Sequence, residues 1–186
     1  MAKRDNHYEA AFEAWLRWLR VPYVAVDESR RAEMGSRSLK SLDFIVSPAS
    51  GQGSWLIDVK GRQFPTAKHQ YWRNWSTADE LASLASWEEV LGLRSGGLLV
   101  FAYNVVGDRA PLAANELFIY RQRLYGFVGI RLDHYTGNAK PLSQRWGTVS
   151  VSVPGFRALA RPAREFLGVP LPTPASIPAP AGIACA

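Results

Sequence analysis

The chain has 186 residues, of which 47% are hydrophobic and 20% are charged, an ordinary balance for one globular domain with a full core. Its formal net charge of +6 favours nucleic acid or another anionic partner. The one cysteine, Cys185, excludes an intramolecular disulfide and a cysteine-based zinc site. The sequence has no signal-peptide run and no membrane-spanning run, so we expect a cytoplasmic protein without a membrane partner.

The first part of the chain predicts a helix followed by strands. Apolar residues at helical spacing begin after Asp5 or Asn6, either of which can cap the helix, and Pro22 ends it. Two later apolar runs flank a segment rich in turn residues and predict a β-hairpin, and the segment from Gly61 to Pro65 breaks the pattern after it. The expected elements are a helix over 7–20, a strand over 23–26, a polar loop over 27–40 and hairpin strands over 42–46 and 55–60.

The second part predicts another helix and more strands. Thr77 and Glu80 fit a capping box, and Gly92 ends the helix that the box begins. The expected elements are a short helix or aromatic loop over 66–75, a helix over 77–91, strands over 98–106, 117–120, 124–132 and 148–153, and a short helix over 163–167. This order argues for an α/β domain with a mixed sheet over 1–169. The Pro- and Ala-rich stretch 170–186 has no charged residue and is expected to be a disordered tail.

The predicted hairpin contains three charged residues, Asp43, Asp58 and Lys60, within otherwise apolar strands. Pairing that is symmetrical about Ser50 and Gly51 places 43 opposite 58, with Cβ atoms roughly 5 Å apart on one face. Asp58 and Lys60 share that face because side chains alternate along a strand. Two carboxylates so close repel each other, and a divalent cation between them removes the conflict. Oxygen ligands of this kind suit Mg²⁺ or Mn²⁺.

These residue types suit phosphodiester hydrolysis. A divalent metal polarises a phosphoryl oxygen and lowers the pKa of bound water, while Lys60 can orient the water and stabilise the transition state. The backbone carbonyl of Val59 is a further candidate ligand. Glu9 and Glu13 lie four residues apart on one face of the first helix, so one of them can complete the site. We prefer Glu9 as the ligand, with Glu13 bound to a metal-bound water or paired with Arg17.

Asp43 followed fifteen residues later by Asp58-Val59-Lys60 resembles the PD-(D/E)xK nuclease superfamily, which includes restriction enzymes and Holliday-junction resolvases. The segment 7–13, HYEAAFE, also resembles the HYExAFE family letter for letter. The resemblance implies a restriction-endonuclease-like mixed β-sheet core flanked by helices, here with extra C-terminal strands. It also implies magnesium and a nucleic-acid substrate, DNA being favoured. The superfamily's Pro before the Asp is replaced here by Leu42.

Basic and aromatic residues are interleaved between residues 60 and 75, which suits contact with a nucleic-acid backbone and with bases. The same pattern suits an amphipathic segment that packs Trp onto the sheet, and the two interpretations stay open. The candidate nucleic-acid contacts are Arg62, Lys68, Gln70, Trp72 and Arg73. The resemblance makes Lys68 and Gln70 candidates for a place beside the metal.

Three functions are compatible with the sequence. The first is a metal-dependent nuclease, as a monomer or a homodimer. The second is a catalytically inactive nuclease-fold module that still binds nucleic acid. The third is a protein that binds a partner through its tail and aromatic surface. An intact Asp, Asp-x-Lys set favours the first, since a decayed site has no reason to keep buried charges.

Overall fold

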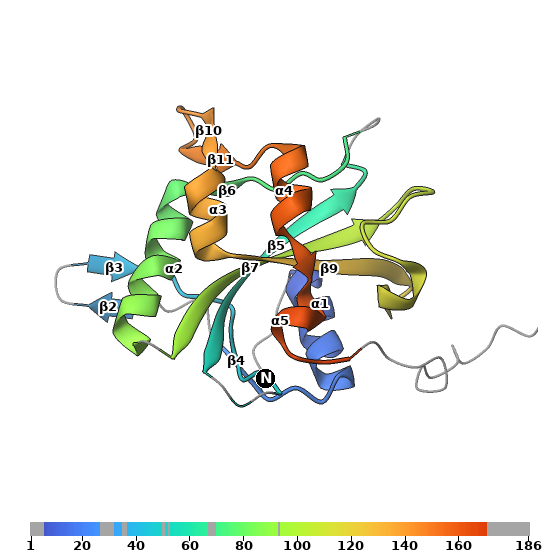
Figure 1. Cartoon of the computed structure of the whole chain (residues 1–186), viewed down its shortest axis with the longest axis horizontal. Helices are drawn as coiled ribbons and strands as arrows, with labels where there is room; N and C mark the ends of the chain where they lie inside the picture. Colours follow the sequence, from blue (N-terminus) through green and yellow to red (C-terminus); the bar gives the residue numbers. More distant parts are fainter. Residues whose placement is uncertain are drawn as a thin grey trace, which may run out of the picture.

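The computed structural model describes residues 6–26, 32–34, 37–49, 51, 53–66, 70–92 and 94–170. A mixed β-sheet forms the centre, with helices on both faces (Figure 1). Its strands run in the order β1-β4-β5-β7-β9-β12, and β8 pairs with β9 beside this path. The strands are β1 (Tyr23–Ala25), β4 (Phe44–Val46), β5 (Ser54–Phe64), β7 (Ser95–Val105), β8 (Phe118–Tyr120), β9 (Arg123–Arg131) and β12 (Arg161–Pro162).

Two smaller ladders accompany the main sheet. One has the order β10-β11-β6, with β10 (Lys140–Ser143), β11 (Thr148–Ser150) and β6 (Ser76–Thr77). The other pairs β2 (Ala32–Met34) with β3 (Arg37–Leu39), so the expected polar loop over 27–40 contains a short hairpin. None of the described helices is long and apolar enough to cross a lipid bilayer.

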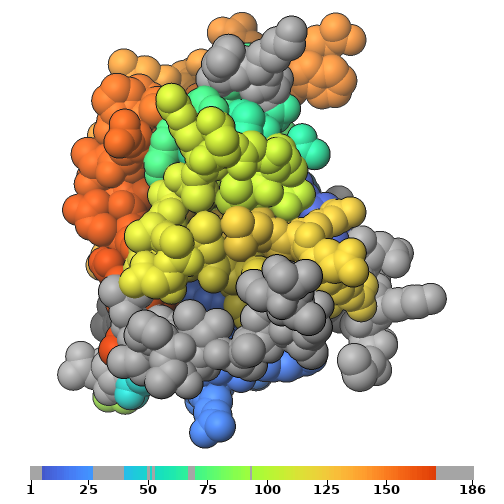
Figure 2. Space-filling model, turned by 90° about the vertical axis from the view of Figure 1, so that its right-hand side faces the viewer, coloured from blue at the N-terminus to red at the C-terminus, as the bar shows by residue number. Residues whose placement is uncertain are grey.

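Each face of the sheet has its own hydrophobic core. One core lies under α1 (His7–Trp18) and α5 (Ala163–Phe166), and its buried residues include Phe12, Leu16, Val59 and Val100. The other lies under α2 (Ala78–Leu91), α3 (Leu132–Asn138) and α4 (Val153–Leu159). Figure 2 shows the neighbouring side of the molecule, where the chain that follows β7 lies beside the red-orange C-terminal helices.

The register of the predicted hairpin is confirmed for the three pairs of β4 with β5, and the expected pair of 43 with 58 lies beyond the end of this ladder. Phe44 pairs with Ile57 and Val46 pairs with Trp55, so the pairing is symmetrical about the point between positions 50 and 51, as predicted. Beyond Ile57 the strand β5 continues to Phe64, in parallel pairing with β7. The expected interruption at Gly61 is therefore wrong. A Cβ at Gly61 would lie 2.1 Å from Cδ2 of Tyr8, so this glycine marks a close approach of the Tyr8 ring to the strand.

Several helix expectations are refined by the structure. Asn6 is the N-cap of α1, and the Thr77–Glu80 capping box begins α2, which Gly92 follows at φ +83°. Two helices, α3 and α4, are absent from the sequence-based expectations. The N-terminus of α3 has no side-chain cap, and the helix is held by its packing, with Leu132 and Tyr135 buried. The strand expected over 148–153 ends at Ser150, and Ser152 then caps α4.

Candidate active site

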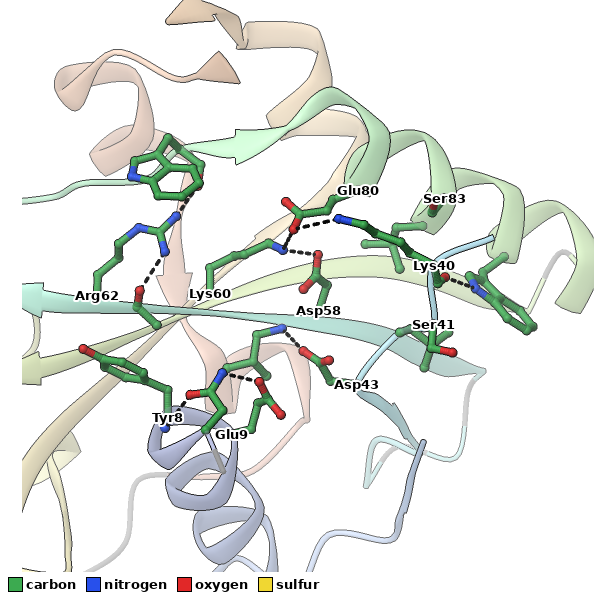
Figure 3. A pocket seen from close by; sticks show the side chains of 17 residues that line it. Tyr8, Glu9, Lys40, Ser41, Asp43, Asp58, Lys60, Arg62, Glu80 and Ser83 are labelled. Carbon is green, nitrogen blue, oxygen red and sulfur yellow. Dashed lines mark hydrogen bonds and ion pairs between the residues drawn. The ribbon is translucent and has the colours of Figure 1, made fainter. Parts of the chain in front are cut away.

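A cavity of about 570 Å³ lies beside the start of β4, where the edge of β5 is left open. From Asp58 onward, no described strand pairs with this edge, because β4 covers β5 only from Trp55 to Ile57. Figure 3 shows Tyr8 and Glu9 on the α1 side of β5, and Lys60, Asp58 and Glu80 on the α2 side. The charged lining residues are Glu9, Lys40, Asp43, Asp58, Lys60, Arg62 and Glu80.

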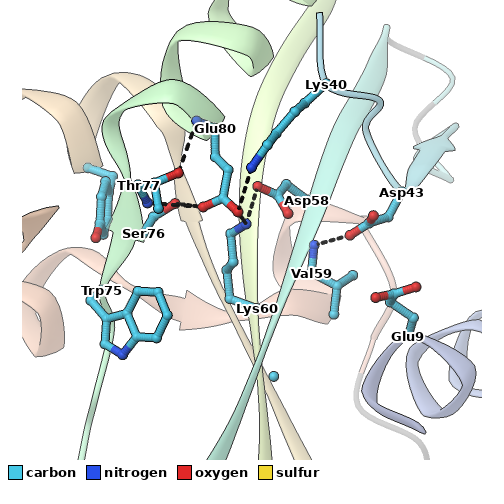
Figure 4. A network of polar contacts seen from close by, with 12 residues as sticks. Glu9, Lys40, Asp43, Asp58, Val59, Lys60, Trp75, Ser76, Thr77 and Glu80 are labelled. Carbon is cyan, nitrogen blue, oxygen red and sulfur yellow. Dashed lines mark hydrogen bonds and ion pairs between the residues drawn. The ribbon is translucent and has the colours of Figure 1, made fainter. Parts of the chain in front are cut away.

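Asp43, directly before the first residue of β4, is fixed by bonds to its backbone and to its side chain. Its N–H donates to the Ile57 carbonyl at 2.9 Å, and its carbonyl accepts the Val26 N–H at 2.9 Å. Its Oδ2 accepts the buried N–H of Val59 at 2.6 Å (Figure 4). The carboxylate thus takes the place of a strand carbonyl at the open edge of β5, and the residue is only 6% exposed.

Lys60 lies between two carboxylates. Its Nζ is 2.8 Å from Oδ2 of Asp58 and 3.0 Å from Oε1 of Glu80 (Figure 4). Burial disfavours the charge of Lys60, but the two carboxylates outweigh that penalty and raise the pKa of Lys60 above its ordinary value. The ammonium is therefore protonated at neutral pH and suits the binding of negative charge rather than the removal of a proton.

Glu80 belongs to this cavity, although its sequence pattern indicates only the start of a helix. Its Oε2 accepts the Thr77 N–H at 3.0 Å and the Ser76 hydroxyl at 3.0 Å, and Nζ of Lys40 lies 3.6 Å from Oε1. Burial disfavours its charge, but attraction to Lys60 and the Thr77 bond lower the pKa of Glu80 to about 2. The capping box is the one sequence signal at this position, and it gives no sign of the contact with Lys60.

The two carboxylates of α1, Glu9 and Glu13, have different surroundings in the structure. Glu9 is 7% exposed, lines the cavity and accepts a hydrogen bond from the Asn6 side-chain amide. Glu13 lies outside the lining and accepts bonds from Arg17 Nη2 at 2.5 Å and from the Tyr23 hydroxyl at 2.9 Å. Of the alternatives left open for Glu13, the geometry corresponds to the pair with Arg17.

Most of the described aromatic-basic segment packs on the protein. The Arg62 guanidinium lies 3.9 Å from the centre of the Trp75 ring and donates to the Gly61 carbonyl, and burial lowers the pKa of Arg62. Trp72 packs its ring against Phe64, Tyr103 and Phe156. Gln70 and Arg73 are exposed, and Lys68 lies outside the described residues. Trp72 therefore corresponds to the second interpretation of this segment, in which a Trp packs on the sheet.

The carboxylates of the cavity are held by donors of the protein in this structure. Asp58 pairs with Lys60, Asp43 accepts from Val59, and Glu9 accepts from Asn6. Within the described ranges, no three side chains among His, Cys, Asp and Glu are grouped so as to hold a metal ion. The predicted ligands therefore line one cavity without converging on one point.

One solved structure provides a comparison with this fold. The chain is similar to the Holliday junction resolvase Hjc of the archaeal hyperthermophile Archaeoglobus fulgidus, with a TM-score of 0.51 and 13% sequence identity. The similarity covers 87% of this chain and 98% of the resolvase chain. No protein-family model and no curated protein matches the sequence, so the HYExAFE resemblance rests on its motif alone. The predicted fold, a restriction-endonuclease-like mixed α/β sheet flanked by helices, is confirmed.

Proposed function

We propose that this chain is a divalent-metal-dependent nuclease that hydrolyses phosphodiester bonds in nucleic acid, with DNA as the favoured substrate. The observation that carries the proposal is the cavity at the open edge of β5, which Asp43, Asp58 and Lys60 all line on a resolvase-like fold. A solved structure similar to this chain is a Holliday junction resolvase, which makes a DNA substrate the first to test.

The charge of the cavity supports a bound cation. The carboxylates of Glu9, Asp43, Asp58 and Glu80 outnumber the cations of Lys40, Lys60 and Arg62. A cavity with this balance repels a phosphodiester unless another positive charge enters it. Carboxylate oxygens are the ligands that Mg²⁺ and Mn²⁺ prefer. The residues present therefore fit a divalent metal by their chemistry.

The metal would be held by Asp43 and Asp58, with Glu9 and the Val59 carbonyl as further ligands. Val59 directs its N–H to Asp43, and in a strand the carbonyl of the same residue points to the same edge. A bound Mg²⁺ supplies a Lewis acid for the phosphoryl oxygen and acidifies a water molecule. Lys60, kept protonated by Asp58 and Glu80, donates to the charge that develops on the phosphoryl oxygens.

A second candidate function has its own support. Asp58 already has a cation partner in Lys60, and the described carboxylates do not converge. This arrangement also suits a nuclease fold that binds nucleic acid without cleaving it.

One experiment separates the two candidates. The purified chain is incubated with plasmid DNA, single-stranded DNA and RNA in Mg²⁺, Mn²⁺ or EDTA, beside Asp58→Asn and the off-cavity control Glu13→Gln. We expect metal-dependent cleavage of DNA by the parent and by Glu13→Gln, and none by Asp58→Asn. Salt-sensitive binding without cleavage would favour the inactive module. Neither binding nor cleavage would reject both candidates.

A further inference from the structure

The hairpin of β10 and β11 carries a Trp that the described protein leaves in solvent. Trp146 is 69% exposed, more than any other large hydrophobic side chain of the described ranges. The guanidinium carbon of Arg145 lies 5.2 Å from the centre of the Trp146 ring. Lys140 on β10 is also exposed, and Gly147 closes the turn at φ +55°. The hairpin forms the upper end of the molecule in Figures 1 and 2, where it is orange.

This hairpin is attached directly to the rim of the cavity. Strand β11 pairs with β6, with Thr148 opposite Thr77 and Val149 opposite Ser76. The Ala78 N–H also donates to the Gly147 carbonyl at 2.9 Å. Ser76 and Thr77 both bond the carboxylate of Glu80, which lines the cavity. The neighbour of Trp146 is thus fixed to the first residue of the helix that carries Glu80.

The charge of this part of the chain suits a polyanion. From His134 to Arg164 the sequence has no acidic residue but five Lys or Arg residues. Three of these contact other parts of the protein: Arg164 pairs with Glu116, Arg157 lies over Trp72, and Arg161 donates to backbone carbonyls. Lys140 and Arg145 are the two on the hairpin, and both are exposed beside Trp146.

We propose that Trp146 stacks on an unpaired base of the substrate, while Arg145 and Lys140 contact the adjacent phosphates. The inference rests on the proposed function and specifies its substrate class: nucleic acid with unpaired nucleotides beside the cleavage site. Arg145 lies over one face of the Trp ring, and exposure leaves area for a base. Bases within a continuous duplex have no free face, so this contact selects single strands, loops, flaps or branched ends.

The test measures binding in EDTA, where a metal-dependent nuclease does not cleave. Two fluorescently labelled probes are used, a single strand of about 20 nucleotides, long enough to cover one binding site, and the matching blunt duplex. Each probe is titrated with the parent, Trp146→Ala, Trp146→Phe or Leu142→Ala, and its fluorescence anisotropy is measured. Leu142 is the matched control, because it lies on the same hairpin and is 60% exposed. We expect Trp146→Ala to weaken single-strand binding by about 5-fold to 150-fold, since stacking on an aromatic ring contributes about 1–3 kcal/mol per base.

The expected pattern has three further parts. Duplex binding changes little in Trp146→Ala, Trp146→Phe recovers part of the single-strand affinity, and Leu142→Ala binds like the parent. The thermal stability of each variant stays close to that of the parent because the side chains are exposed.

The failures of the two proposals differ. A parent that neither binds nucleic acid in EDTA nor cleaves it in Mg²⁺ or Mn²⁺ overturns the proposed function, and the inference falls with it. A parent that cleaves with metal but binds no single strand in EDTA overturns the inference alone, because the hairpin contact needs no metal. Unchanged single-strand binding by Trp146→Ala overturns the inference alone, as does an equal loss for single strand and duplex. A parent dimer that Trp146→Ala converts to a monomer in sedimentation would show that the ring contacts a second copy of the chain, which also overturns the inference.

Discussion

Val59 donates its buried N–H to Oδ2 of Asp43 at 2.6 Å, across the point where β4 stops covering β5. The bond gives Asp43 a structural role as well as the proposed metal role. A strand edge that opens into a cavity needs an acceptor for its buried N–H, and an acidic side chain provides it here. The two roles are separable by mutation, because the amide of asparagine also has an acceptor oxygen.

Asp43→Ala is expected to lower the free energy of unfolding by about 1–3 kcal/mol, since it leaves the Val59 N–H without its acceptor. Asp43→Asn keeps an acceptor and should retain most of the stability, yet lose most of the affinity for Mn²⁺ because the ligand charge is gone. Urea denaturation measures the first quantity and calorimetric Mn²⁺ titration the second. Equal Mn²⁺ affinity in parent and Asp43→Asn would remove Asp43 from the proposed metal site.

Lys60→Met is expected to slow cleavage by a factor of at least about 10², because its ammonium acts mainly on charge that forms in the transition state. Substrate affinity should change much less than the rate. Single-turnover cleavage and equilibrium binding, measured on the same DNA, separate the two effects. A Lys60→Met variant that cleaves at the parent rate would leave Lys60 as a structural partner of Asp58 and Glu80.

Glu80→Gln should change how the free energy of unfolding depends on pH in the acidic range. The pKa of Glu80 is lowered from 4.5 to about 2, so the unfolded chain binds the proton first as pH falls. The stability that Glu80 contributes is complete above about pH 4.5 and is lost as pH falls toward 2. Glutamine can retain the capping box while it removes the charge. The free energy of unfolding of Glu80→Gln should therefore fall less steeply over this interval than that of the parent.

The size of this effect is on the order of 1–2 kcal/mol, because the carboxylate is partly exposed and solvent screens it. Urea denaturation of both proteins at several pH values between about 2 and 5 measures it. Glu80→Ala serves as the comparison that loses the cap and the charge together. Parallel curves for the parent and Glu80→Gln would show that the charge of Glu80 contributes nothing to acid stability.

Glu9→Gln is expected to weaken Mn²⁺ binding, whereas Glu13→Gln should leave it close to that of the parent. Glu9 is buried against the cavity, while Glu13 is bonded to Arg17 and Tyr23 outside it. Both variants remove one negative charge from the same helix, so each controls for the other. The reverse ranking would transfer the ligand role to Glu13, and two negligible effects would exclude α1 from the metal site.

Gly61→Ala is expected to destabilise the protein by about 1–3 kcal/mol, because the added methyl group would overlap the ring of Tyr8. The double variant Tyr8→Ala with Gly61→Ala should lose less stability than the sum of the two single variants, since removal of the ring frees the space. Thermal or urea unfolding of the two single variants and the double variant measures this coupling. Strictly additive losses of stability would show that Gly61→Ala does not act through overlap with the Tyr8 ring.

The hairpin could be predicted from sequence because its information is local. The register follows from a loop of fixed length, and alternation assigns faces to Asp58 and Lys60. The contact between Lys60 and Glu80 depends on the parallel pairing of β5 with β7, which places the intervening helix over one face of the sheet. No periodicity in the sequence indicates that the side chains of Lys60 and Glu80 lie close together. The role of Gly61 escapes prediction for a similar reason, since the group it accommodates, Tyr8, is far away in the sequence.

The sequence leaves two interpretations of residues 60–75 open because an aromatic ring that packs on the protein and one that stacks on a base look alike in sequence. Trp72 packs against the core, while Trp146, which no sequence pattern distinguishes from it, is exposed. The tail expected after residue 170 lies outside the described part of the chain.

Glu80 makes two contacts at once, one at the N-terminus of α2 and one with Lys60 on β5, so the opening of this helix end is linked to the ion pair on the strand. Its carboxylate holds the Thr77 N–H at the start of α2 and Nζ of Lys60 on β5. Fraying of the first turn of α2 therefore releases both partners in one event. Amide hydrogen exchange at Thr77 and Glu80 would then accelerate in a Lys60→Met protein, although neither amide touches residue 60. The exchange rate of a helix terminus would thereby report the occupancy of an ion pair on the facing strand.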